Sequence, residues 1–142
     1  MQSNAEFRQR ISKLRHFFQR DARVIVKNES LNHFRQSFRD EGFTDEALDP
    51  WPDISERRKA QKRRKNGSLP KILTDTGDLG ASLTGAVEGG DVVISSDLPY
   101  ARRHNEGLAG MPKRQFMGPS KALTQTIKTK LDRGIGRLLN RF

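Results

Sequence analysis

The sequence predicts a single α+β domain over residues 1–142, with a long N-terminal helix, a small antiparallel sheet built around a central hairpin, and a C-terminal amphipathic helix. Three observations lead to this prediction. Apolar residues recur at helical spacing at both ends of the chain. Two β-prone segments flank a Gly-Gly pair in its middle. A chain of 142 residues has room for one modest core.

The N-terminal segment, residues 5–39, is predicted to be helical because its apolar residues fall on one helix face. They are Phe7, Ile11, Leu14, Phe18, Ile25, Leu31, Phe34 and Phe38. Gly42 is expected to end the helix. The run Val24 to Val26 favours a strand locally, so the pattern is compatible with one long helix or with two.

Residues 42–70 are predicted to form an extended polar excursion, interrupted by two prolines and the turn pair Asn66-Gly67. It contains at most a short helix near residues 55–64. Its few large apolar groups do not offset the entropy of ordering, so we expect it to be loosely packed in an isolated subunit. Trp51 is the expected anchor, either on its own subunit or at an interface with a neighbouring one.

Residues 71–118 are predicted to contain the sheet and short helices. Residues 84–88 and 91–95 form a hairpin in this prediction, because Gly89 and Gly90 both accept the positive φ of a tight turn. Shorter elements are expected around it: a strand at Lys71 to Leu73, a helical turn at Thr76 to Leu83, a helix from Pro99 to Asn105 and a strand at Gln115 to Met117. Residues 119–139 form the C-terminal helix, opened by Pro119 and Ser120.

Charge is the strongest compositional signal, with 27 Lys and Arg against 17 Asp and Glu. Residues 40–56 hold seven acids and no base, and the next nine residues hold seven bases. Such a change of sign favours head-to-tail contact between subunits, although a solvated mobile loop remains an alternative. The candidates for contact with DNA or with another subunit are Arg57, Arg58, Lys59, Lys62, Arg63, Arg64 and Lys65.

Several classes of function are excluded or disfavoured by what the sequence lacks. Without cysteine there is no disulfide framework, thiolate zinc site or iron-sulfur cluster. No glycine-rich phosphate motif is present, so no nucleotide cofactor is implied. No apolar run approaches the roughly 20 residues of a membrane span, and the charged N-terminus does not resemble a signal peptide. We therefore expect no cofactor, no membrane partner, and a soluble cytoplasmic protein.

Three patterns resemble catalytic or metal sites. Gly80-Ala81-Ser82 lacks the closing glycine of a nucleophile elbow. His104 and Glu106 have no third ligand, which disfavours a metal site. Asp75-Thr76-Gly77 matches the catalytic turn of aspartic proteases, in which two aspartates share a proton. That fold is nearly all β, whereas this sequence is rich in helical pattern, so the protease is kept only as a minor alternative.

An ordered series of three motifs resembles the phage virion morphogenesis (tail completion) family over about residues 31–121. The series runs from Ile72 to Leu83, then from Pro99 to Gly107 after a hairpin, then from Pro112 to Gly118. The residues that carry it are Asp75, Thr76, Gly77, Leu79, Ser82, Tyr100, Ala101, His104, Gly107, Pro112, Arg114 and Phe116. Glu106 and Gln115 depart from an aromatic and a proline that are frequent in the family.

The resemblance implies a structural, non-enzymatic α+β subunit that assembles as a homo-oligomeric ring, hexameric by analogy with the family. It would complete the tail or join tail to head. The implied partners are further copies of itself, tail tube and head-connector proteins, and phage DNA passing through without sequence preference. The implied location is the head–tail interface of the virion, with assembly in the host cytoplasm. A free, non-specific DNA-binding protein is the main alternative.

The motif residues also have expected physical roles. The Asp75 carboxylate would cap the following helical turn, and Gly77 would relieve a tight backbone. Tyr100 and Phe116 would fill the core, and His104 would bond to a backbone group. Arg114 is expected either to form an ion pair between subunits or to be a plain surface residue.

Overall fold

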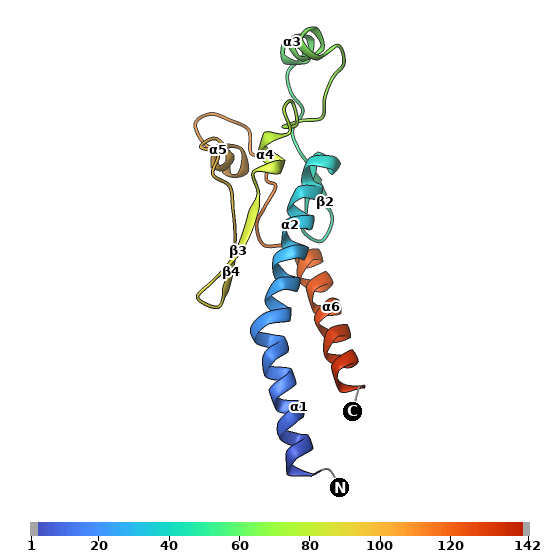
Figure 1. The fold of residues 1–142 in the computed structure, drawn as a ribbon. Helices are drawn as coiled ribbons and strands as arrows, with labels where there is room; N and C mark the ends of the chain where they lie inside the picture. The colour runs from blue at the N-terminus through green and yellow to red at the C-terminus, as the bar shows by residue number, and fades with distance from the viewer. Residues whose placement is uncertain (1–2, 141–142) are drawn as a thin grey trace.

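The computed structural model describes residues 3–140, and its main feature is a long helical rod (Figure 1). The rod is formed by α1 (Asn4–His16), a π-helical turn (Phe17–Asp21) and α2 (Ala22–Asp40), which follow one another without interruption. Ser3 and Glu6 form a capping box that starts it. The N-terminal segment is thus one helix with a π-helical turn, which answers the question of one helix or two.

The C-terminal helix α6 (Lys121–Leu139) lies beside the rod, so that both ends of the chain are at the same end of the molecule (Figure 1). The side chain of Ser120 accepts a hydrogen bond from Leu123 N and caps the helix, as the sequence predicts. The two helices approach closely where Gly134 faces Phe17, because a Cβ at this glycine would lie 2.7 Å from the ring.

The first part of residues 42–70 packs against the body, where Phe43 and Trp51 are buried, and the part that follows stands out at the end of the molecule away from the termini (Figure 1). The rod ends at Glu41, and β1 (Gly42–Thr44) then pairs with β2 (Leu48–Pro50) in a short antiparallel hairpin. Its turn holds the start of α6, because Ala122 N donates to Asp45 O at 2.9 Å. The expected short helix is α3 (Glu56–Asn66), which Ser55 caps. Contacts within the chain thus hold the first part of this segment, and its expected loose packing in an isolated subunit stays a prediction.

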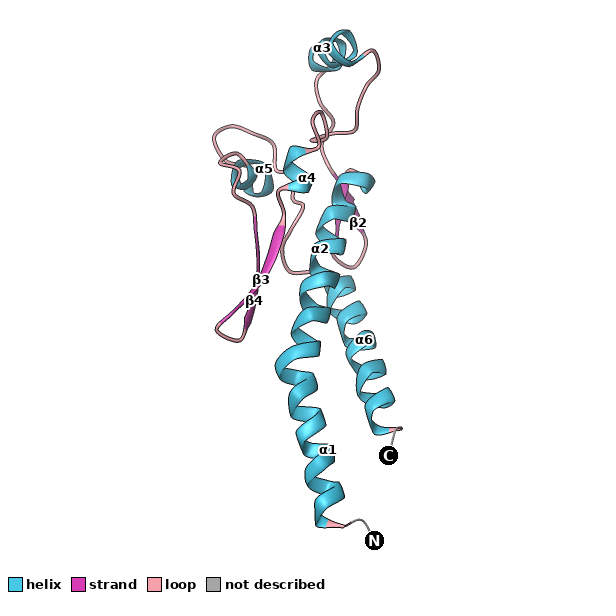
Figure 2. Cartoon of the chain, in the orientation of Figure 1, coloured by secondary structure: helices cyan, strands magenta, loops and turns pink. Residues whose placement is uncertain are grey.

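The central hairpin is confirmed. β3 (Thr84–Glu88) and β4 (Asp91–Ser95) are antiparallel, with Glu88 opposite Asp91 and positive φ at Gly89 and Gly90. It lies beside α2 as a second two-stranded sheet (Figure 2). Gly85 allows it to approach α2, because a Cβ there would lie 2.6 Å from the Lys27 side chain. Two short helices border this hairpin in the chain: α4 (Asp78–Ala81) and α5 (Ala101–Glu106).

The core lies where α2, the β1–β2 hairpin, α4 and the start of α6 meet. Phe38 is at its centre, with ring centroids 5.6 Å from Trp51 and 5.2 Å from Phe116. Leu83 and Phe116 are its most deeply buried side chains. The other members are Phe34, Phe43, Ile72, Leu79, Ala101 and Leu123. Within residues 3–140, no helix has the length and apolar character needed to cross a membrane.

Two expected strands are wrong. Residues 71–73 form a turn, in which Thr74 N donates to Lys71 O and Leu73 has a φ of 60°. Residues 115–117 are irregular, because the N–H groups of Phe116 and Met117 both donate to the side-chain oxygen of Asn105. A side chain thus supplies the acceptor that a neighbouring strand would have offered.

Candidate functional site

The three motif segments converge around a cavity of about 430 Å³ between α3 and the body of the subunit. Six of the motif residues lie on its wall: Asp75, Thr76, Leu79, Tyr100, His104 and Arg114. The remaining wall comes from Arg58 and Lys62 of α3 and from Ile54, Ile72 and Leu73. Segments that are distant in the sequence therefore meet at one place.

A buried ion pair joins α3 to the first of these segments. Lys62 Nζ lies 2.7 Å from Asp75 Oδ1, and the side chains are 7% and 26% exposed. Arg58 adds a longer contact of 3.7 Å to the same carboxylate. A buried ammonium needs such a partner, since taking an unpaired charge out of water is costly. Lys62 therefore faces the body and is not available for DNA.

The expected capping role of Asp75 is wrong, because its carboxylate is turned towards α3. Gly77, with a φ of 74°, is the N-cap residue of α4 and offers no side-chain cap. The first turn is instead supported by Thr76, whose Oγ1 accepts from Asp78 N at 3.3 Å. Asp75 also does not resemble one half of a proton-sharing pair, because its partners are a lysine and an arginine.

Arg114 is buried, which contradicts both roles expected for it. Its Nε donates to Pro52 O at 2.9 Å and its Nη2 to Asp53 O at 3.1 Å. The side chain is 7% exposed. Burial lowers the pKa of Arg114, but an arginine stays charged at neutral pH because its ordinary pKa is so high. Arg114 therefore fastens the segment before α3 to the third motif within one subunit.

His104 is not held by the backbone bond expected for its ring. Its Nδ1 is buried and has no hydrogen-bond partner among the described residues. Burial, and then the nearby Arg114 cation, lower the pKa of His104, so the ring is neutral at pH 7. The rings of His104 and Tyr100 meet in a T-shaped arrangement, with ring centroids 6.1 Å apart. Tyr100 is 38% exposed and lies at the cavity wall, so the expectation that it fills the core is wrong.

Trp51 anchors its own subunit. It is 7% exposed, and its Nε1 donates to Gln115 O at 2.7 Å. The alternative of an anchor at a neighbour's surface is therefore wrong for this side chain. Phe116 fills the core as expected, and its carbonyl accepts from Ser37 Oγ. Asn105 was missed by sequence reasoning, because a single polar residue in a short helix gives no signal of its double acceptor role.

The other motif residues shape turns and packing. Gly107 ends α5 with a φ of 71°, and a Cβ there would lie 2.9 Å from Lys113. Ser82 shares a hydrogen bond of 2.6 Å with Ser96, at the base of the central hairpin. Ala101 is buried in the core, and Pro112 is exposed in the loop that leads to Arg114.

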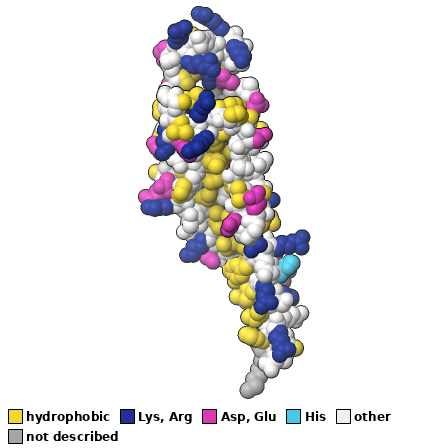
Figure 3. Space-filling model, turned by 90° about the vertical axis from the view of Figure 1, so that its left-hand side faces the viewer, with side chains coloured by type: hydrophobic (Ala, Val, Ile, Leu, Met, Phe, Trp, Pro, Cys, Tyr) yellow, Lys and Arg dark blue, Asp and Glu magenta, His cyan; other side chains and the backbone are white. Residues whose placement is uncertain are grey.

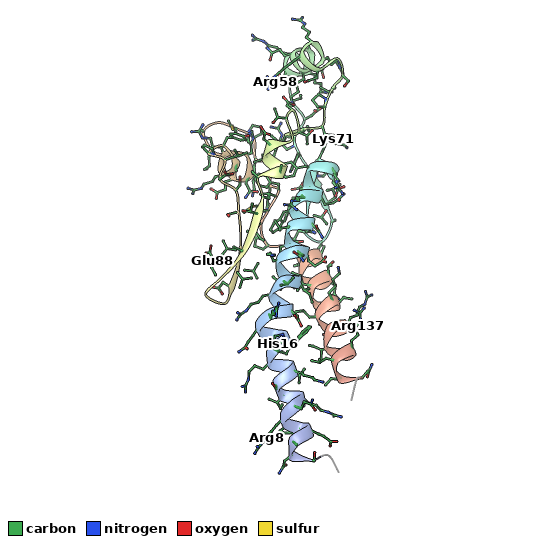
Figure 4. All side chains as sticks on the ribbon, viewed as in Figure 1. Arg8, His16, Arg58, Lys71, Glu88 and Arg137 are labelled. Atoms are coloured by element: carbon green, nitrogen blue, oxygen red, sulfur yellow. The ribbon has the colours of Figure 1, made fainter. Side chains whose placement is uncertain are left out.

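The rest of the basic run forms an exposed face on α3, at the opposite end of the molecule from the termini (Figures 1 and 4). Its members are Arg57, Arg58, Arg63, Arg64 and Lys65. Lys59 is engaged by Asp53 at 2.7 Å and Glu56 at 3.1 Å. The hydrogen bond to Asp53 is the main cause that raises the pKa of Lys59, and the same bond lowers the pKa of Asp53.

The model of the phage virion morphogenesis family matches residues 31–135, which include all three motif segments and most of the core. The chain belongs to this family. Family membership gives it a role in building the phage virion. No curated protein and no solved structure matches the chain. The match begins within α2, so the whole of α1 lies outside it.

The motif residues thus make contacts within the subunit and hold its segments together. Four kinds of contact join segments of one subunit. They are the ion pair of Lys62 with Asp75, the hydrogen bonds of the buried Arg114 guanidinium, the hydrogen bond of the Trp51 indole and the packing of the Phe38 and Phe116 rings. Among residues 3–140, no three His, Asp or Glu side chains are grouped in a way that could hold a metal ion. Exposed surfaces of the described residues include the basic side chains of α3, the apolar side of α1 and the β1–β2 hairpin.

Proposed function

We propose that this chain is a structural subunit that completes the phage tail or joins tail to head as a homo-oligomeric ring. The observation that carries the proposal is that the motif residues of the family hold the subunit together. Residues with this role are expected in a structural protein, which acts through its shape and its contacts. In this proposal the ring is hexameric and lies at the head–tail interface, against tail tube and head-connector proteins, after assembly in the host cytoplasm.

The exposed bases of α3 support a second element of the proposal, a surface compatible with passing DNA. Duplex DNA carries a charge for about every 1.7 Å of its axis, so any protein around its path benefits from positive side chains. Arg57, Arg63 and Arg64 are exposed, and none has an ion pair among the described residues. We expect this contact to be weak, sensitive to salt and independent of sequence.

The ring is tested with the purified chain by mass photometry and negative-stain electron microscopy. The proposal predicts closed particles of one defined copy number, with a central opening. A chain that stays monomeric at every concentration, also when tail tube and connector proteins are added, would contradict it.

The DNA contact is tested by replacing Arg57, Arg63 and Arg64 with glutamine and measuring binding against salt concentration. A matched control replaces three exposed bases of α6, Lys128, Arg133 and Arg137, and lowers the net charge equally. If α3 meets DNA, the first variant loses up to about 3 units of the salt slope and the second loses much less. Equal losses would assign binding to net charge alone. Tight binding by a monomer would favour a free DNA-binding protein.

A further inference from the structure

The outer face of α1 is apolar and uncovered. Phe7, Ile11 and Phe18 are 58%, 41% and 50% exposed, and Leu14 is half-buried. Their spacing of four, three and four residues puts them on one side of a helix. α6 covers a different side, where Phe17 is buried against Gly134. Figure 3 shows hydrophobic side chains continuing from the body onto the end that carries the N-terminal helix.

This stripe contains a shallow hollow whose rim is basic. The hollow has a volume of about 290 Å³ and is lined by Phe7, Arg8, Ile11, Ser12 and Arg15. Both arginines are exposed, and neither has an ion pair among the described residues. A contiguous exposed apolar patch with a charged rim is typical of a protein contact site. Two α1 helices packed face to face would bring like charges together, so the rim favours an acidic occupant.

An acidic and apolar projection is present on the same chain. In β2, beside the acidic turn, Leu48 is 46% exposed and is followed by Asp49. Asp45 and Glu46 are held by the start of α6, since Asp45 accepts from Lys121 N and Glu46 pairs with Lys121 Nζ at 2.6 Å. The turn is therefore held in place against α6. Asp49 has no ion pair among the described residues and remains available to a partner.

We propose that the β1–β2 hairpin of one copy docks on α1 of the next copy. Leu48 enters the hollow between Phe7 and Ile11, and Asp49 meets the arginines of its rim. The two surfaces cannot meet within one copy, because Ile11 and the end of α2 are separated by about 45 Å of helix at 1.5 Å per residue. Donor and acceptor surfaces differ, so the contact is head-to-tail and repeats around a ring. This inference rests on the proposed homo-oligomeric function.

The contact is tested by disulfide trapping, for which the chain offers a background without cysteine. Ile11→Cys and Leu48→Cys proteins are made separately, mixed, and oxidised with copper phenanthroline. The control pair is Ile11→Cys with Leu108→Cys. Leu108 lies in the loop after α5 and has a similar exposure, 39%. We expect cross-linked dimers of the first pair to exceed those of the control pair several-fold. Equal yields, or a dominant Ile11–Ile11 product, would overturn the inference.

Charge reversal provides a second test in the full chain. Arg8→Glu with Arg15→Glu, and separately Asp49→Lys, should each weaken self-association by about tenfold or more, and mixing the two proteins should restore part of it. Circular dichroism checks that each variant is folded. Normal rings from both variants, with no trapping, would refute this contact and leave the ring itself intact. Failure of the unmodified chain to self-associate would refute the proposed function instead.

Discussion

Replacing Gly134 with alanine tests the close approach of α6 to the rod. Alanine is favoured over glycine inside a helix by about 1 kcal/mol. At this position, however, the added Cβ would lie 2.7 Å from Cε2 and Cζ of the buried Phe17 ring. Overpacking of this kind costs about 1 to 3 kcal/mol. We therefore expect a net loss of up to about 2 kcal/mol in the free energy of unfolding.

Gly136→Ala is the matched control, because it makes the same change in the same helix and its Cβ would meet nothing within 4 Å. This variant should gain up to about 1 kcal/mol from helix propensity alone. Both are measured by urea unfolding at one fixed protein concentration, since the stability of an oligomer depends on concentration. If Gly134→Ala is as stable as Gly136→Ala, the helices do not pack as described.

Four further predictions concern the cavity and the core. Asp75→Ala should cost about 2 kcal/mol of stability by leaving the buried Lys62 charge unpaired, and Lys62→Met should cost less than half as much; equal costs in urea unfolding would refute this. Asp75→Asn, which keeps an acceptor oxygen, should still form rings, whereas a proteolytic activity abolished by it would contradict a structural role. The pKa of His104 is lower in the folded chain than in the unfolded chain, where it is about 6.5. The unfolded chain therefore binds a proton more readily below this pH, and the free energy of unfolding falls towards pH 5. His104→Gln should lose less stability than the unmodified chain between pH 7 and 5, and an unchanged profile would argue against a buried neutral ring. Trp51→Phe removes the bond to Gln115 O and should cost about 1 to 2 kcal/mol, with little change expected in ring formation.

The elements that the sequence predicts well are those fixed by local physics. The hairpin at residues 84–95 follows from two glycines that accept positive φ, and the start of α6 follows from the capping hydroxyl of Ser120. The rod follows from apolar residues at helical spacing over residues 5–39. The convergence of the motif segments at one cavity was not predicted from the sequence, because their order along the chain does not fix their positions in space.

The features that the sequence does not predict depend on partners distant in the chain. The β1–β2 hairpin has few apolar residues, and its turn is held by α6 some 75 residues later. From the sequence alone Arg114 is expected to be a surface cation. Its burial depends on the carbonyls of Pro52 and Asp53, which accept its hydrogen bonds and lie about 60 residues earlier. Lys62 is indistinguishable from its basic neighbours in sequence, because only the position of Asp75 makes it a buried charge.

The central claim, that this chain is a structural part of the head–tail joint, is tested most directly in particles. The gene is deleted from a phage or prophage that encodes it, and the products are viewed by electron microscopy. The account predicts that heads and tails accumulate without joining, or that the tails have incomplete ends. The chain supplied in trans is expected to restore complete particles. It also predicts that the rescuing protein is found at the joint of the finished virion. Intact, infective particles that lack the protein would contradict it.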